Sequence, residues 1–281
     1  MTLSANPNQA AAPLPGPGEA SALEKRVRNA LTQRHHAGSA PILLMAHLVL
    51  GYPSLDENRR VIDAMVANGV DLIELQIPFS EPIADGPVIA MANQAALDRG
   101  FRVAEGLGFL GEVVRQHPIP FLLMTYFNIL HAHGVEAFIR ETKVLGGDGL
   151  IVPDLPLEEA GPARTLCQDV GVDWIQLMTP TTPEARLAAI GAAARGFCYC
   201  VARKGVTGRQ TEFDNTIDGF LDRCRSVTGV PLALGFGVKS AKDVQNLVGK
   251  ADIAVVGTAA MEVHRTGGVF AVGRFFADLR T

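Results

Sequence analysis

The chain has 281 residues, of which 48% are hydrophobic and 19% charged, enough for one large domain or two small ones. Its formal net charge of -4 argues against a nucleic-acid partner, which would select a strongly basic footprint. No apolar run approaches the roughly 20 residues that cross a bilayer, and the N-terminus lacks the basic-then-apolar order of a secretory signal, so no membrane partner is expected.

Residues 1–20 are rich in Pro, Ala and Gly, a composition that predicts a disordered N-terminal tail. We expect a single folded domain over residues 21–281. The four cysteines match no zinc-binding spacing and indicate reduced, buried thiols in a cytoplasmic protein: Cys167, Cys198, Cys200 and Cys224.

A helix is predicted over Ala22–His36, with Ser21 as a possible N-cap and Gly38 at its end. Eight apolar, β-rich runs follow, and nearly every gap between them carries a helical segment. The runs are Leu43–Leu50, Val70–Gln76, Pro120–Tyr126, Gly149–Val152, Val172–Met178, Gly196–Ala202, Val230–Leu234 and Asp252–Val256.

Strands that are apolar on both faces are typical of a parallel sheet buried on each side. Eight strand–helix units in about 250 residues match the size and repeat number of a (β/α)8 barrel. The competing fold is a doubly wound open sheet, which would show a glycine fingerprint after its first strand. That position reads Leu50-Gly51-Tyr52-Pro53, so we predict an α/β protein with a single (β/α)8 TIM barrel and an extra N-terminal helix.

A pair of carboxylates lies in and after the second run, within Asp71–Pro87 (DLIELQIPFSEPIADGP). Glu74 is inside an apolar strand, where a carboxylate is costly unless it is partnered or used. Asp85 follows on a loop that can fold back over the end of this strand. Two carboxylates placed in this way suit proton transfer to and from one small molecule. The spacing equally allows a structural ion pair at Glu74 and a plain turn at Asp85.

Glycine-bearing turns follow the sixth, seventh and eighth runs, at the strand ends where a barrel carries its chemistry. Glycine lets backbone N–H groups approach an anion closely, and a helix N-terminus beside such a turn adds a positive dipole end. Ordinary strand–helix turns are the alternative. The pattern predicts a phosphate site at Gly205, Gly235, Gly237, Gly257 and Thr258, with residues 205–215 long enough to form a lid.

Four segments carry a resemblance to a known family: ELQIPFSEPIADGPVIAMAN, GLIVPDLPLEEA, GVTG and GFGV, in this order and spacing. From about residue 42 to the C-terminus the chain resembles the α subunit of tryptophan synthase. The resemblance implies a (β/α)8 barrel and a lyase that cleaves indole-3-glycerol phosphate to indole and glyceraldehyde 3-phosphate in tryptophan biosynthesis. It further implies no cofactor in this chain and a PLP-dependent β subunit as partner in an α2β2 heterotetramer.

By motif, Glu74 matches the family's acid/base, Asp85 its ADGP carboxylate and Tyr199 a tyrosine near that acid. Cleavage without a proton donor would expel an indole carbanion, so protonation of the ring at C3 must come first. Glu74, favoured in its protonated form by apolar neighbours, can donate this proton, and Asp85 can accept a hydrogen bond from the ring N–H. Glu74 can serve again as the base for the glycerol hydroxyl.

Five residues depart from the family pattern, one of them Val49, at a position that is often Thr. Gln76 stands where the family usually has Gly and would protrude toward the pocket, and Glu81 replaces a usual Asp. His47 occupies a position that is commonly apolar or aromatic, and we interpret it as a pocket-wall residue with satisfied hydrogen bonds. Lys204 stands at a position that is commonly smaller.

Three alternatives to this function remain at the level of sequence. The first is a Schiff-base aldolase that uses Lys204, although its place beside a Gly-rich loop argues for exposure. The second is a catalytically weak regulatory subunit that activates a PLP-dependent β subunit. The third is a free-standing lyase that releases indole. A partner surface is expected around Pro78–Pro82 and Pro153–Pro156.

Overall fold

The computed structural model describes residues 19–201, 215–235 and 237–281, so most of the predicted tail over 1–20 lies outside the described residues. The strands of the described part are β1 Leu43–Val49, β2 Leu72–Gln76, β3 Phe121–Met124, β4 Gly149–Ile151, β5 Asp173–Trp174, β6 Gln176–Met178, β7 Cys198–Val201, β8 Leu232–Gly235 and β9 Ile253–Val256. Its helices are α1 Ala22–His36, α2 Leu55–Ala67, α3 Pro87–Asp98, α4 Val103–Gln116, α5 Phe127–His133, α6 Val135–Val144, α7 Gly161–Val170, α8 Glu184–Ala193, α9 Asn215–Val227, α10 Ala241–Leu247 and α11 Thr258–Asp278.

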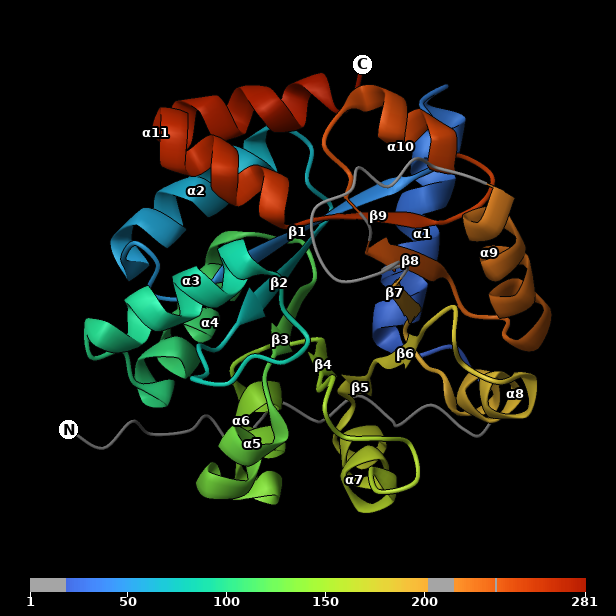
Figure 1. Cartoon of the computed structure of the whole chain (residues 1–281), viewed down its shortest axis with the longest axis horizontal. Coiled ribbons are helices and arrows are strands. Elements are labelled where there is room, and N and C mark those ends of the chain that lie inside the picture. The colour runs from blue at the N-terminus through green and yellow to red at the C-terminus, as the bar shows by residue number, and fades with distance from the viewer. Residues whose placement is uncertain (1–18, 202–214, 236) are drawn as a thin grey trace, which may run out of the picture.

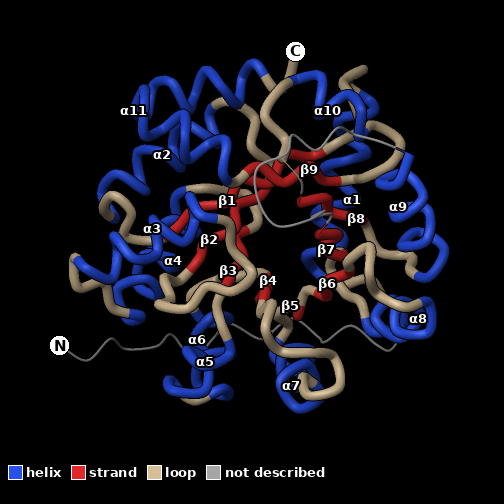
Figure 2. The backbone as a smooth tube through the Cα atoms, in the orientation of Figure 1, coloured by secondary structure: helices blue, strands red, loops and turns tan. Residues whose placement is uncertain are grey.

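The strands form one parallel sheet in the order β5-β4-β3-β2-β1-β9-β8-β7-β6. β5 pairs with β4 and β6 pairs with β7, and only Ile175 separates β5 from β6 along the chain. These two short strands therefore form one continuous barrel strand, and the sheet closes into a barrel of eight strands. Figures 1 and 2 show the ring of strands with helices around it. The predicted (β/α)8 barrel is confirmed, and the open-sheet alternative is wrong.

The barrel has an inner and an outer layer of apolar side chains because successive strand residues point to opposite faces. β1 is buried along its whole length. Leu43 and Met45 pack inside the barrel with Leu72, whereas Leu44 and Ile73 pack outside it against the helices. The two layers explain why most strand residues are apolar on both faces of the sheet.

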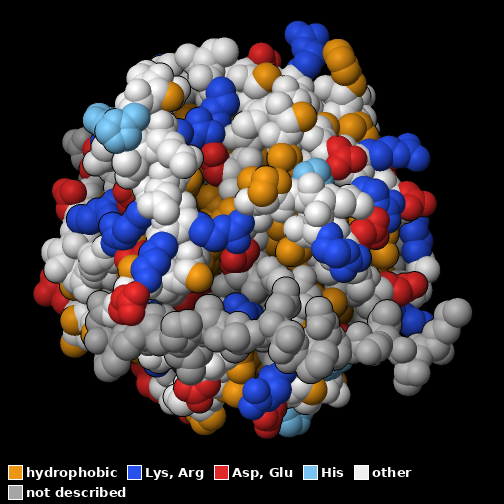
Figure 3. All heavy atoms as spheres, turned by 180° about the vertical axis from the view of Figure 1, so that it is seen from behind, with side chains coloured by type: hydrophobic (Ala, Val, Ile, Leu, Met, Phe, Trp, Pro, Cys, Tyr) orange, Lys and Arg blue, Asp and Glu red, His pale blue; other side chains and the backbone are white. Residues whose placement is uncertain are grey.

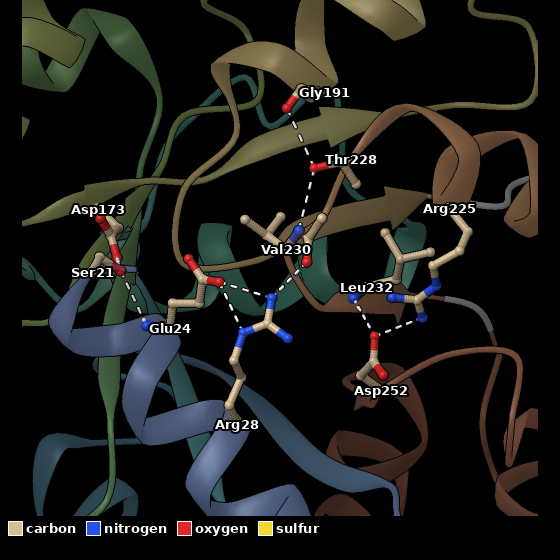
Figure 4. A network of polar contacts seen from close by, with 11 residues as sticks. Ser21, Glu24, Arg28, Asp173, Gly191, Arg225, Thr228, Val230, Leu232 and Asp252 are labelled. Atoms are coloured by element: carbon tan, nitrogen blue, oxygen red, sulfur yellow. Dashed lines mark hydrogen bonds and ion pairs between the residues drawn. The ribbon is translucent and has the colours of Figure 1, made fainter. Parts of the chain in front are cut away.

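Helix α1 closes the end of the barrel where the strands begin, and this confirms the predicted extra helix. Leu23 and Val27 are buried in the interior cluster, below the first residues of the strands. The Ser21 hydroxyl hydrogen-bonds to the Asp173 carboxylate at the start of β5. Figure 4 shows this contact, with Arg28 of α1 reaching the turn before β8. The functional groups must therefore lie at the opposite end.

The face of the molecule seen in Figure 3 has positive and negative side chains interspersed with small apolar areas, in agreement with the small net charge. Among the helices of the described part, none has the length and apolar character that a membrane span requires.

Candidate active site

Three polar side chains enter the barrel from two neighbouring strands. His47 lies opposite Glu74 in the register of β1 with β2, and Gln76 follows Glu74 by two residues. They continue the inward-facing positions of Met45 and Leu72, so all three point into the barrel interior. All three residues are at most 5% exposed. A polar group buried this deeply is costly without a partner or a use.

Glu74 faces His47, and no Lys or Arg pairs with it among the described residues. Its Oε2 lies 3.3 Å from His47 Nδ1, close enough for charge attraction, yet the geometry falls short of a directed hydrogen bond. Burial disfavours the charged imidazolium, but the negative charges of Glu74 and Asp85 outweigh it and raise the pKa of His47. His47 Nε2 has no hydrogen-bond partner among the described residues. The expectation that His47 is fully satisfied was therefore wrong.

Asp85 is held against the barrel mouth by two side chains. Its Oδ2 accepts hydrogen bonds from Gln76 Nε2 at 2.6 Å and from the Tyr126 hydroxyl at 3.1 Å. The Tyr126 hydroxyl in turn accepts one from the backbone N–H of Ala84 at 3.1 Å, which ties the loop before Asp85 to β3. Burial raises the pKa of Asp85, and the hydrogen bonds and the nearby His47 charge oppose that rise.

Tyr199 on β7 completes this group of side chains. Burial and then the negative charges of Glu74 and Asp85 raise the pKa of Tyr199 well above its usual value, so the phenol stays a hydrogen-bond donor. Its ring lies over Gly235 of β8, where an added Cβ would come within 2.5 Å of Cε1. Glycine is thus required at 235 by the tyrosine ring. Strand register and the hydrogen bond from Gln76 bring the two carboxylates and His47 to one interior space, and Tyr199 is close enough for their charges to raise its pKa.

The predicted phosphate residues lie beside this space, on β8, β9 and the turns that follow. Gly257 is the N-cap of α11 and Thr258 its first residue, so a helix N-terminus begins directly after β9. Gly237 has a left-handed φ of 48°. Gly205, Lys204 and the predicted lid up to residue 214 lie outside the described residues.

Three residues of the site had a smaller role in the expectations from sequence. Gln76 was expected to protrude toward the pocket and His47 to be a wall residue, and Tyr126 had no role beyond ending the third apolar run. The signal for Gln76 and His47 was available, because both lie at even spacing from neighbouring inward-facing residues. Their partners depend on strand register and loop folding, which the sequence does not display.

The family model described as tryptophan synthase alpha chain matches residues 35–266. A tryptophan synthase alpha chain of Syntrophotalea carbinolica is 51% identical over 258 residues, covering 92% of this chain and 100% of the relative. One of Desulfotalea psychrophila is 50% identical over 239 residues, covering 85% of this chain and 94% of the relative.

Solved structures agree with these relatives. Tryptophan synthase of Mycobacterium tuberculosis superimposes with a TM-score of 0.84 at 31% identity, covering 93% of this chain and 98% of that one. A chain of the tryptophan synthase α2β2 complex of Pyrococcus furiosus gives a TM-score of 0.79 at 32% identity, covering 84% and 97%.

Proposed function

We propose that Glu74 and Asp85 are the catalytic carboxylates of this chain, which belongs to the tryptophan synthase alpha chain family. The members of this family are lyases that cleave indole-3-glycerol phosphate to indole and glyceraldehyde 3-phosphate in tryptophan biosynthesis. The observation that carries this proposal is the position of the two carboxylates. One carboxylate points into the barrel from β2 and the other is held over its mouth by Gln76 and Tyr126.

Glu74 supplies the proton that makes indole a leaving group. Protonation at C3 of the indole ring turns a strongly basic carbanion into neutral indole as the carbon–carbon bond breaks. Glu74 is 3% exposed as a residue, so water competes little for this proton. General acid catalysis of this kind contributes about 10²- to 10⁴-fold to a rate.

Asp85 stabilises the positive charge that develops on the ring. As a carboxylate it accepts a hydrogen bond from the indole N–H when C3 is protonated, and it is already oriented before substrate arrives. Tyr199 donates its hydroxyl toward the same space. The phosphate group binds at the turns of Gly235, Gly237 and Gly257, with Thr258 and the N-terminus of α11 beside it. Gly205, outside the described residues, is assigned to this set by its sequence motif alone.

The protein works with a tryptophan synthase β subunit in an α2β2 heterotetramer, as the Pyrococcus complex does. Ile83, 80% exposed on the loop that carries Asp85, supports a partner at this end of the barrel. Residues 21–281 act as a single catalytic domain. The four buried, unpaired cysteines support a reducing location, the cytoplasm.

The test is an assay of indole-3-glycerol phosphate cleavage by the isolated chain, in which the appearance of indole is measured. Glu74→Gln removes the transferable proton at nearly constant volume. We expect kcat to fall by about 10³-fold while glycerol phosphate binds as tightly as in the unaltered protein. Glu136→Gln, at an exposed glutamate paired with Arg140, is the matched control and keeps full activity. Substantial turnover by the Glu74 variant would refute the assignment.

A further inference from the structure

The cleavage reaction has two proton transfers, and a single residue, Glu74, is poorly placed to carry out both. C3 of the indole ring gains a proton, and the neighbouring glycerol hydroxyl loses one as it becomes the aldehyde. A single carboxyl group would have to give its proton on one side of the breaking bond and collect the other on the opposite side. The structure places a second titratable side chain, His47, in contact with Glu74.

His47 lies between Glu74 and the phosphate turn. Its Nδ1 faces Glu74, while Gly257 is on its other side, where an added Cβ would lie 3.6 Å from the imidazole Cδ2. The glycerol chain of the substrate must span this interval, because it connects the ring at Glu74 to the phosphate at Gly257. Nε2, which is bonded to Cδ2, is buried and has no partner among the described residues. A buried imidazole nitrogen left unpaired costs free energy that a bound hydroxyl would recover.

We propose that His47 is the base that removes the proton of the glycerol hydroxyl, and that Glu74 acts only as the acid at C3. This rests on the proposed function of Glu74 above. The Glu74 carboxyl gives its proton to C3 and His47 Nε2 takes the hydroxyl proton. The electrons of that O–H bond form the aldehyde C=O, and those of the broken carbon–carbon bond return to the ring.

The two side chains end the step with the same total of protons. Glu74 is then a carboxylate and His47 an imidazolium, so a proton crosses the 3.3 Å contact from Nδ1 to Oε2. The Nε2–H proton exchanges with water as the products leave, and the starting tautomer is restored. The reaction therefore needs no co-reactant.

The charges around His47 stabilise the imidazolium that the proposed step forms. Among the described residues, Glu74 of β2 and Asp85 of the following loop face it as titratable groups, and Gln76 faces it as a neutral one. Before the step Glu74 holds the proton and His47 is neutral, with Nε2 free to accept. Burial opposes the imidazolium, but once Glu74 is a carboxylate its charge and that of Asp85 raise the pKa of His47, which favours the imidazolium that the step forms. Tyr199, facing Glu74 from β7, stays protonated and adds no charge.

The experiment separates the two proton transfers with His47→Phe, which keeps an aromatic ring and removes both nitrogens. The first readout is kcat for cleavage of indole-3-glycerol phosphate. The second is exchange of the C3 hydrogen of indole in D2O with glycerol phosphate present, which needs only the acid at C3. We expect cleavage to fall about 10²-fold and exchange to stay within threefold. Glu74→Gln is expected to lose both.

Three comparisons make the result decisive. His264→Phe removes a half-buried histidine whose Nε2 lies 3.1 Å from Glu57 Oε1, and we expect neither readout to change. His47→Gln is the second variant if His47→Phe unfolds, with the same expected pattern. Cleavage above one third of the unaltered rate, or an equal loss of cleavage and exchange, would overturn the role of His47. Retained cleavage by Glu74→Gln would instead remove the proposed function itself.

Discussion

At the scale of single residues, Gln76 favours the charged form of Asp85. A carboxyl group that is largely removed from water has its pKa raised by burial, and an uncharged Asp85 could not accept the indole N–H. The 2.6 Å hydrogen bond from Gln76 Nε2 favours the carboxylate form and fixes its direction. Gln76 thus supports the second carboxylate instead of obstructing the pocket.

Gln76→Met keeps the volume of this buried side chain and removes its N–H donor. Loss of the hydrogen bond raises the pKa of Asp85 further, so activity that needs the carboxylate is lost at a higher pH as the solution is acidified. We expect the acidic limb of the pH profile of kcat/KM to move up by about one unit, equivalent to about 1.4 kcal/mol.

The matched control for this change is Gln94→Met, because Gln94 donates an equally short 2.6 Å hydrogen bond to Asp98 on the surface. Its pH profile is expected to coincide with that of the unaltered protein. An unmoved acidic limb in the Gln76 variant would show that the His47 charge and the Tyr126 hydroxyl suffice to hold Asp85 ionised.

At the scale of elements, α1 closes the end of the barrel where the strands begin. Leu23 is 1% exposed and fits against two glycines at the starts of strands. An added Cβ would approach Leu23 Cδ2 within 3.4 Å at Gly149 and within 3.0 Å at Gly196. Helix α1 contributes to stability through these apolar contacts and lies at the end of the barrel opposite the site.

Leu23→Ala leaves a cavity under the barrel, and we expect it to lower the free energy of unfolding by about 3 kcal/mol. Because the site lies at the other end, kcat is expected to stay within twofold. Urea unfolding together with the cleavage assay measures both quantities. Leu31→Ala, on the same helix but only half-buried, is expected to cost less than half as much. Equal costs would mean that α1 does not pack through Leu23.

At the scale of the whole molecule, the end of the barrel that bears the site presents apolar side chains to solvent. Ile83 lies two residues before Asp85 and is 80% exposed, and Met91 on the following helix is 42% exposed. Large apolar groups exposed near a site are typical of surfaces that a partner covers. A β subunit docked here would contact the same loop that holds Asp85.

Ile83→Asp places a charge where a partner would remove water, so we expect it to weaken association with a purified tryptophan synthase β subunit at least about tenfold, or 1.4 kcal/mol. Titration of indole release with the β subunit gives the apparent Kd. Val144→Asp, at an apolar side chain 84% exposed on α6 near the starts of the strands, is the control and is expected to leave the Kd unchanged. Equal affinity for the two variants would place the partner elsewhere.

Much of the architecture followed from the sequence because it depends on local order. The periodicity over Ala22–His36 and the cap at Ser21 specify α1 to the residue. Apolar runs separated by helical segments predict the eight strands of the barrel, and runs that are apolar on both faces predict a parallel sheet. The division of the fifth strand into β5 and β6 was not predicted. Only Ile175 separates the two, and the path of the chain does not change there.

The sequence by itself also determined that Glu74 and Asp85 are the carboxylates to consider, because an acid inside an apolar strand is informative wherever it occurs. Only the tertiary structure decided what surrounds them. His47 is 27 residues from Glu74, and it becomes its neighbour through the register of β1 with β2. Tyr126 reaches Asp85 across 41 residues because the loop folds back over β3. Contacts between distant segments depend on how strands are paired and how loops close, and these are properties of the assembled barrel.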